Sequence, residues 1–128
     1  MVKTVSFRTN SSSTPTYIGS TVADIDSAVE RNKEYKKLLW SGKYMQIYGM
    51  SIPIGDEIGL EAHNNDQFIK IESGRAKIVL GRDNGELNYE RIVDDGDTVL
   101  ILANTPHNVI NVGDEDLKLL SIYAPILQ

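Results

Sequence analysis

The sequence contains no cysteine among its 128 residues. Disulfide bonds and thiol catalysis are therefore excluded, and the fold has to be held by its core alone, for which this length suffices. The absence of cysteine fits a reducing compartment, so we expect a cytoplasmic protein.

Long apolar runs and clusters of positive charge are also missing. The longest unbroken apolar run covers residues 99–103, which is far too short to cross a bilayer, and the first twenty residues contain no apolar signal-peptide core. The formal net charge is -5 and no run of lysine or arginine occurs. We therefore expect neither a nucleic acid nor a membrane as partner.

Several enzyme signatures are absent as well. The sequence has no glycine-rich phosphate loop, no metalloprotease helix and no Ser-His-Asp order. It contains only two histidines, His63 and His107, which leaves few groups for general acid–base catalysis.

What the sequence does contain is a series of short β-type segments separated by polar turns. Asp83-Asn84-Gly85 is typical of a type I′ hairpin turn. Many short strands with Gly, Asn and Asp turns predict an all-β sandwich or barrel. The expected strands cover residues 35–40, 44–52, 59–63, 67–73, 75–81, 86–93, 97–103, 108–112 and 117–124, with a weaker edge strand at 3–8.

The N-terminal part differs from the rest. We expect residues 1–20 to form an arm that packs against the domain or against a second subunit, and residues 21–128 to form one domain. Thr21 with Asp24 resembles a capping box, which predicts a helix over residues 22–33. Its apolar stripe would contain the following three residues: Val22, Ile25 and Val29. A homodimer is the expected assembly.

Potential metal ligands are concentrated around the first histidine. Because strand side chains alternate between faces, Glu61 and His63 are expected on one side of their strand. Gln67 should return to that side after a turn at residues 64–66. His107 is the second imidazole, within residues 96–111.

The spacing of these residues resembles the two sequence motifs of the cupin family. The first motif corresponds to Gly55, Glu61, His63, Gln67 and Gly74, and the second to Gly96, Leu102, Asn104, His107 and Asn111. Every spacing is kept, and the similarity extends over residues 31–125. It is greatest to small single-domain cupins of the type labelled mannose-6-phosphate-isomerase-like. The resemblance implies a double-stranded β-helix, the jelly-roll form of an all-β barrel.

In cupins, three histidines and a glutamate hold a divalent transition metal inside the barrel. Here Glu61 replaces one of the histidines and Gln67 replaces the glutamate, so one carboxylate is retained. The resemblance therefore implies that Glu61, His63, Gln67 and His107 hold Fe, Mn, Ni or Zn. Two imidazoles with one carboxylate also match the ligand sets of non-haem Fe(II).

A metal-free interpretation stays open beside this one. His63 and His107 could be hydrogen-bonded polar residues, with Glu61 turned to solvent and Gln67 bonded to a backbone carbonyl. Asp66 could be a turn residue or could orient a histidine ring.

A second polar group lies on the strand expected at residues 44–52. Tyr44, Gln46, Tyr48 and Met50 share one face of this strand, either in the core or at the barrel mouth. Tyr48 and Asp66 are the candidates for moving a proton.

Three functions remain compatible with the sequence. One is a metal-dependent enzyme of isomerase or dioxygenase type that acts on a small organic or sugar-derived substrate. Another is a non-catalytic protein that binds a small molecule or carbohydrate. The third is a dimeric accessory protein. The fold alone does not select among them.

Overall fold

The computed structural model describes residues 16–81 and 89–126. This part of the chain contains one helix, α1 (Ile25–Arg31), and eight strands. The strands are β1 (Lys36–Ser41), β2 (Gln46–Ile52), β3 (Asp66–Ser73), β4 (Ala76–Leu80), β5 (Tyr89–Val93), β6 (Thr98–Ile101), β7 (His107–Asn111) and β8 (Leu117–Ala124). The edge strand expected at 3–8 and the turn expected at 83–85 lie outside the described residues.

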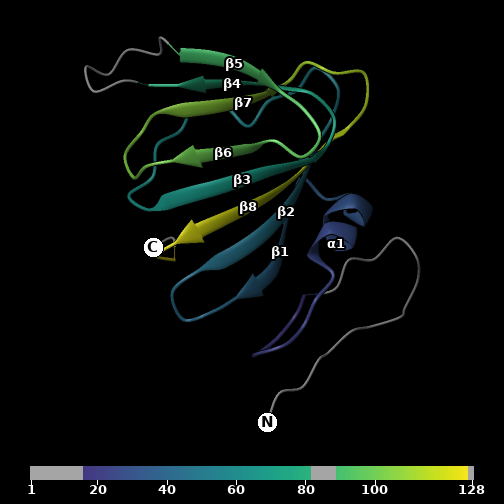
Figure 1. The fold of residues 1–128 in the computed structure, drawn as a ribbon, viewed down its shortest axis with the longest axis vertical. Helices are drawn as coiled ribbons and strands as arrows, with labels where there is room; N and C mark the ends of the chain where they lie inside the picture. The colour runs from purple at the N-terminus through teal and green to yellow at the C-terminus, as the bar shows by residue number, and fades with distance from the viewer. Residues whose placement is uncertain (1–15, 82–88, 127–128) are drawn as a thin grey trace.

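The strands form two antiparallel sheets, as Figure 1 shows. The larger sheet has the order β1-β2-β8-β3-β6 and the smaller one β5-β4-β7. Side chains from both sheets form one buried core, with Ile52 and Ile71 from the larger sheet and Ile78 and Val109 from the smaller. The predicted all-β jelly roll is therefore confirmed.

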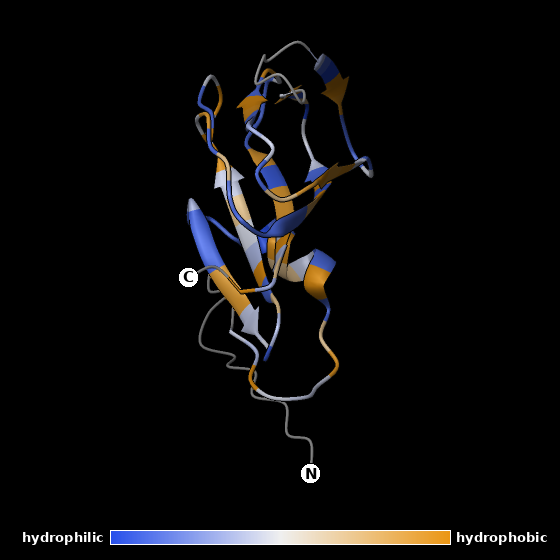
Figure 2. Cartoon of the chain, turned by 90° about the vertical axis from the view of Figure 1, so that its left-hand side faces the viewer, coloured by the Kyte–Doolittle hydropathy of each residue, from blue (hydrophilic) through white to orange (hydrophobic). Residues whose placement is uncertain are grey.

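Alternation along the strands decides which side chains enter this core, and it is visible as orange and blue bands in Figure 2. Residues directly opposite each other in paired strands lie on the same face. Met50 on β2 pairs with Leu119 on β8, which pairs with Ile71 on β3, and all three are buried. This row forms part of the apolar end of the inner face.

The same inner face becomes polar toward its other end. Gln46 on β2 pairs with Tyr123 on β8, which pairs with Gln67 on β3. One row nearer the apolar end, Tyr48 pairs with Ser121. The sheet thus presents amide and hydroxyl groups to the interior at one end of the sandwich.

The helix is shorter than predicted and begins later. Asp24 caps it, because its Oδ1 accepts a hydrogen bond of 3.1 Å from the N–H of Ser27. Thr21 lies outside the helix, so the predicted capping box is wrong. Asn32 ends the helix with an extended backbone, and its side chain bonds Glu34 instead.

The helix covers the outer face of the larger sheet with a second apolar cluster. Ala28 and Val29 are fully buried against Leu39 and Leu120. Val22 was predicted to belong to the stripe, but it precedes the helix and is 89% exposed. The predicted stripe is therefore wrong at its first position and correct at Val29.

The described end of the N-terminal arm packs along β1. Tyr17 is buried, and its N–H donates to the carbonyl of Leu39 over 2.7 Å. The indole N–H of Trp40 donates to the carbonyl of Gly19 over 2.8 Å. Residues 16–20 therefore lie against their own domain.

The strand expected at residues 59–63 is not a regular strand. Single bridges join Glu57 to Ile110 and Glu61 to His107, so this segment follows the free edge of β7 discontinuously. Gly55 and Gly59 have φ values of 78° and 100°, which interrupt an extended ladder. In the part of the chain that the structure describes, no helix is long and apolar enough to span a membrane.

Candidate metal centre

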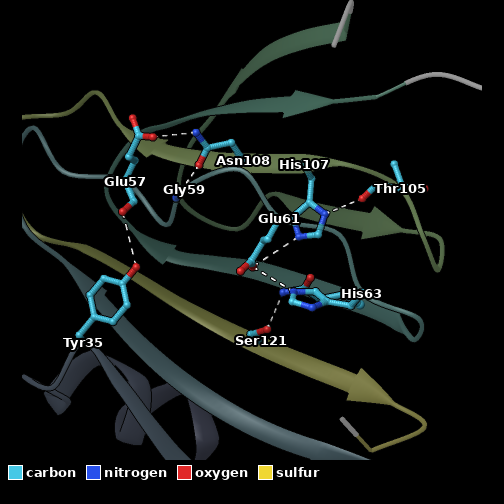
Figure 3. Close-up of polar contacts among 10 residues, drawn as sticks. Tyr35, Glu57, Gly59, Glu61, His63, Thr105, His107, Asn108 and Ser121 are labelled. Atoms are coloured by element: carbon cyan, nitrogen blue, oxygen red, sulfur yellow. Dashed lines mark hydrogen bonds and ion pairs between the residues drawn. The ribbon is translucent and has the colours of Figure 1, made fainter. Parts of the chain in front are cut away.

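The backbone of Glu61 is paired with that of His107. The N–H of Glu61 donates to the carbonyl of His107 over 3.0 Å, and the N–H of His107 donates back over 2.9 Å. Two bonds from the Asn108 side chain support this edge, one accepted from the N–H of Gly59 and one donated to Glu57 Oε1 (Figure 3). The side chains of Glu61 and His107 therefore leave the backbone at positions directly opposite each other.

The side chain of Glu61 turns inward, between the two imidazoles (Figure 3). Its Oε1 lies 3.1 Å from His63 Nε2 and 3.6 Å from His107 Nε2. The potential ligand atoms of these three residues all lie within 4.8 Å of one another. The predicted approach of Glu61 to His63 is thus found and His107 joins them, although an irregular edge segment produces this arrangement rather than a regular strand. The alternative in which Glu61 turns to solvent is not what the structure shows.

The hydrogen bond made by His107 Nδ1 identifies which ring nitrogen of His107 carries the proton. His107 Nδ1 lies 2.8 Å from the carbonyl of Thr105, and a carbonyl can only accept a hydrogen bond. Nδ1 therefore carries the proton, and Nε2 directs a lone pair toward Glu61. Metal-bound histidines are commonly oriented through such a bond to a backbone carbonyl.

Gln67 lies on the inner face of β3 and is 4% exposed. Its Nε2 donates to Ser121 Oγ over 2.9 Å, which leaves Oε1 without a hydrogen-bond partner among the described residues. The Nε2 atoms of His63 and His107 are likewise buried, and neither is aligned for a hydrogen bond with Glu61. An unpaired buried polar atom costs about 1–3 kcal/mol, so three of them together, with lone pairs on His107 Nε2 and Gln67 Oε1, fit a bound cation.

The charges of the centre follow from these contacts. The adjacent imidazoles lower the pKa of the Glu61 carboxyl, His107 first and then His63, against the opposing effect of burial. Glu61 is therefore held ionised. Burial raises the pKa of the Tyr123 phenol, and the negative charge of Glu61 adds to this effect, so Tyr123 keeps its proton at neutral pH.

Two residues of β8 next to the centre were missed by the sequence analysis. Ser121 orients Gln67, and the Tyr123 ring packs edge-on against His63 with centroids 5.6 Å apart. Alternation in residues 117–124 places both side chains on one face. Only the position of β8 between β2 and β3 directs that face to the centre.

Tyr48 and Asp66, the two candidates for proton transfer, differ in burial and in their hydrogen-bond partners. Tyr48 is half-buried on the inner face, its ring lies 5.7 Å from that of Tyr123, and its hydroxyl donates to Gln46 Oε1 over 3.2 Å. Asp66 is exposed, and its Oδ1 accepts from the N–H of Ala103. Asp66 thus ties down a loop, whereas Tyr48 belongs to the polar end of the inner face.

The asparagines of the second motif have structural roles. The buried amide of Asn111 donates to the carbonyls of Ile52 and Glu115, both over 2.9 Å, and its oxygen accepts from Gly113. Asn104 has a φ of 66°, a conformation that asparagine adopts more readily than other non-glycine residues.

A jelly roll of two antiparallel sheets with a His/Glu group between them defines a cupin-type protein. The chain belongs to the cupin family, because the cupin-domain family model matches residues 49–123.

Two bacterial relatives are considerably similar in sequence. The chain is 46% identical over 105 residues to the YrkC protein of Bacillus subtilis, which covers 81% of this chain and 56% of that protein. It therefore spans little more than half the length of that relative. The BH2720 structure from Bacillus halodurans is 41% identical with a TM-score of 0.80, over 84% of this chain and 83% of the other.

More distant structures share the fold alone. Bacillus subtilis oxalate decarboxylase, a protein with Mn(II) centres, is 17% identical with a TM-score of 0.61. The match covers 66% of this chain and 22% of the decarboxylase.

Proposed function

We propose that Glu61, His63 and His107 hold a divalent transition metal, with Gln67 Oε1 as a neutral fourth donor. The observation that carries this proposal is a set of three buried polar atoms that have no hydrogen-bond partner among the described residues and lie beside an ionised carboxylate: two imidazole Nε2 atoms and the Gln67 oxygen. Two imidazoles and one carboxylate suit Fe, Mn, Ni or Zn and leave coordination positions for a substrate.

The centre is accessible from solvent on one side. The side chains of Glu61 and His63 are 31% and 21% exposed, whereas that of His107 is only 2% exposed. A bound metal would supply Lewis-acid or oxygen-binding chemistry of isomerase or dioxygenase type to a small organic or sugar-derived substrate. The phenol rings of Tyr48 and Tyr123, 5.7 Å apart, would line the site of that substrate beside the centre.

A non-catalytic protein that binds small molecules is the second candidate. The observation that favours it is the neutral amide of Gln67 at the position where the family motif has a carboxylate, because an amide oxygen is a poorer metal donor. In that case a small ligand would raise the melting temperature equally with and without a chelator. Loss of this stabilisation on chelation would count against it.

Elemental analysis of protein purified without a histidine tag tests the metal centre. We expect nearly stoichiometric Fe, Mn, Ni or Zn in the wild type and none in His107→Ala. Asp66→Asn is the matched control, because it alters an exposed side chain that ties a loop, and it should keep the metal. Equal metal content in wild type and His107→Ala, or no metal in wild type after anaerobic reconstitution, would contradict the proposal.

A further inference from the structure

Lys36 places a cation at the polar end of the inner face. It pairs directly with the core residue Met50, so its side chain starts from the inner side of β1. Its Nζ lies 4.7 Å from the ring centroid of Tyr48 and 5.2 Å from that of Tyr123. Two aromatic faces therefore hold the ammonium group on this side of the sheet.

Tyr123 connects this cation to the candidate metal centre. The same ring that lies beneath Lys36 packs edge-on against the imidazole of His63. The ring of Tyr123 thus contacts both the ammonium group and one residue of the ligand set.

The charge of Lys36 has no counter-ion within residues 16–81 and 89–126, although the whole chain has 18 acidic and only 13 basic residues. Its neighbour Lys37 lies on the outer face, opposite Gly49, and pairs with Glu34 over 3.8 Å. Lys36 is exposed, so a dissolved anion can reach it.

We propose that this site takes a small organic dianion. One oxygen-bearing group would lie at the Glu61, His63 and His107 centre, and a carboxylate would pair with Lys36 Nζ. The inference rests on the proposed function, because a divalent cation beside the single charge of Glu61 leaves a net positive centre. Two positive positions separated by phenols favour a ligand with a negative group at each end over a neutral sugar.

The test compares thermal stabilisation of the metal-loaded protein by malonate and succinate in the wild type and in Lys36→Met. We expect both dicarboxylates to raise the melting temperature of the wild type, with apparent affinity about tenfold or more weaker in Lys36→Met. Lys37→Met is the matched control and should bind like the wild type. Lys36→Arg keeps the charge and should retain most of the affinity.

Neutral malonamide, acetate and inorganic phosphate are the comparison ligands, and the dicarboxylates should stabilise the protein more than each of them. Metal content is measured on every variant, so that failure of the metal centre is distinguished from failure of the anion site. Normal metal content with equal dicarboxylate affinity in wild type and Lys36→Met would overturn the inference alone. Phosphate binding that depends on Lys36 without carboxylate binding would overturn the ligand class, and absence of metal would overturn both proposals.

Discussion

The amide of Gln67 donates a 2.9 Å hydrogen bond to the hydroxyl of Ser121 across the β3–β8 pair. This bond fixes which end of the amide faces Ser121 and leaves the oxygen as a buried acceptor. Ser121 itself is fully buried. The orientation of the proposed fourth donor therefore depends on a hydroxyl group from the neighbouring strand.

Replacing Ser121 by alanine should weaken metal binding without removing it. The variant leaves the buried Gln67 amide without its acceptor, which should lower the free energy of unfolding by about 1–2 kcal/mol. Loss of an orienting partner typically lowers metal affinity by about tenfold or more. Chelator competition and urea unfolding measure the two effects. Ser51→Ala removes another buried serine hydroxyl and should leave metal affinity unchanged; an equal loss there would contradict the assigned role.

Gln67→Glu should tighten metal binding, by about tenfold, because a carboxylate is a stronger donor than an amide. The metal-free variant should be less stable than wild type, since position 67 is only 4% exposed and burial disfavours a charged carboxylate. Chelator competition measures the expected gain in metal affinity, and thermal unfolding without metal measures the expected loss of stability. Gln46→Glu adds the same charge elsewhere on the polar end of the inner face. If it tightened metal binding equally, charge alone would explain the effect and Gln67 would not be a donor.

Two glycines of the motifs should differ in their tolerance of alanine. Both have positive φ, 110° at Gly74 and 86° at Gly96. A Cβ at Gly74 would lie 3.2 Å from Leu117 Cα, whereas a Cβ at Gly96 would have nothing within 4 Å. We expect Gly96→Ala to cost about 1–2 kcal/mol from strain alone and Gly74→Ala about 2–4 kcal/mol. Equal losses in urea unfolding would show that the Leu117 contact is unimportant.

Glu72 should make stability depend on pH. Its side chain is 8% exposed, and burial raises the pKa of its carboxyl group; nearby Asp26 adds to this rise, while Lys70 Nζ at 3.1 Å opposes it. Because the folded-state pKa exceeds the unfolded one, the associated stability is present at low pH and is lost as pH rises through the folded pKa.

Glu72→Gln should therefore be more stable than wild type at neutral pH, and the difference should vanish as pH falls below the ordinary carboxyl pKa. Thermal unfolding at neutral pH and at about pH 4 tests this. Glu90→Gln removes a more exposed carboxylate, 3.8 Å from Lys77, and should change stability by less than about 0.5 kcal/mol at both pH values. A variant of Glu72 that is less stable at neutral pH would show that the Lys70 contact dominates.

The sequence by itself determined most of the strands and the candidate ligands. Period-two alternation and polar turns are local properties, so they identified the β segments without knowledge of their partners. The spacing around His63 and His107 was likewise sufficient to name Glu61 and Gln67 as candidate ligands beside them. Asn104 at positive φ was also foreseeable, because that preference belongs to the residue itself.

The tertiary structure decided what surrounds those ligands. Helix α1 begins after Asp24 rather than Thr21, because packing against the sheet selects among competing local signals. Ser121, Tyr123 and Lys36 join the polar end of the inner face only because β8 pairs with both β2 and β3 and because β1 pairs with β2. Pairing between strands distant in sequence is set by the burial of the whole core and not by any local pattern, so only the fold could place these three residues beside the centre.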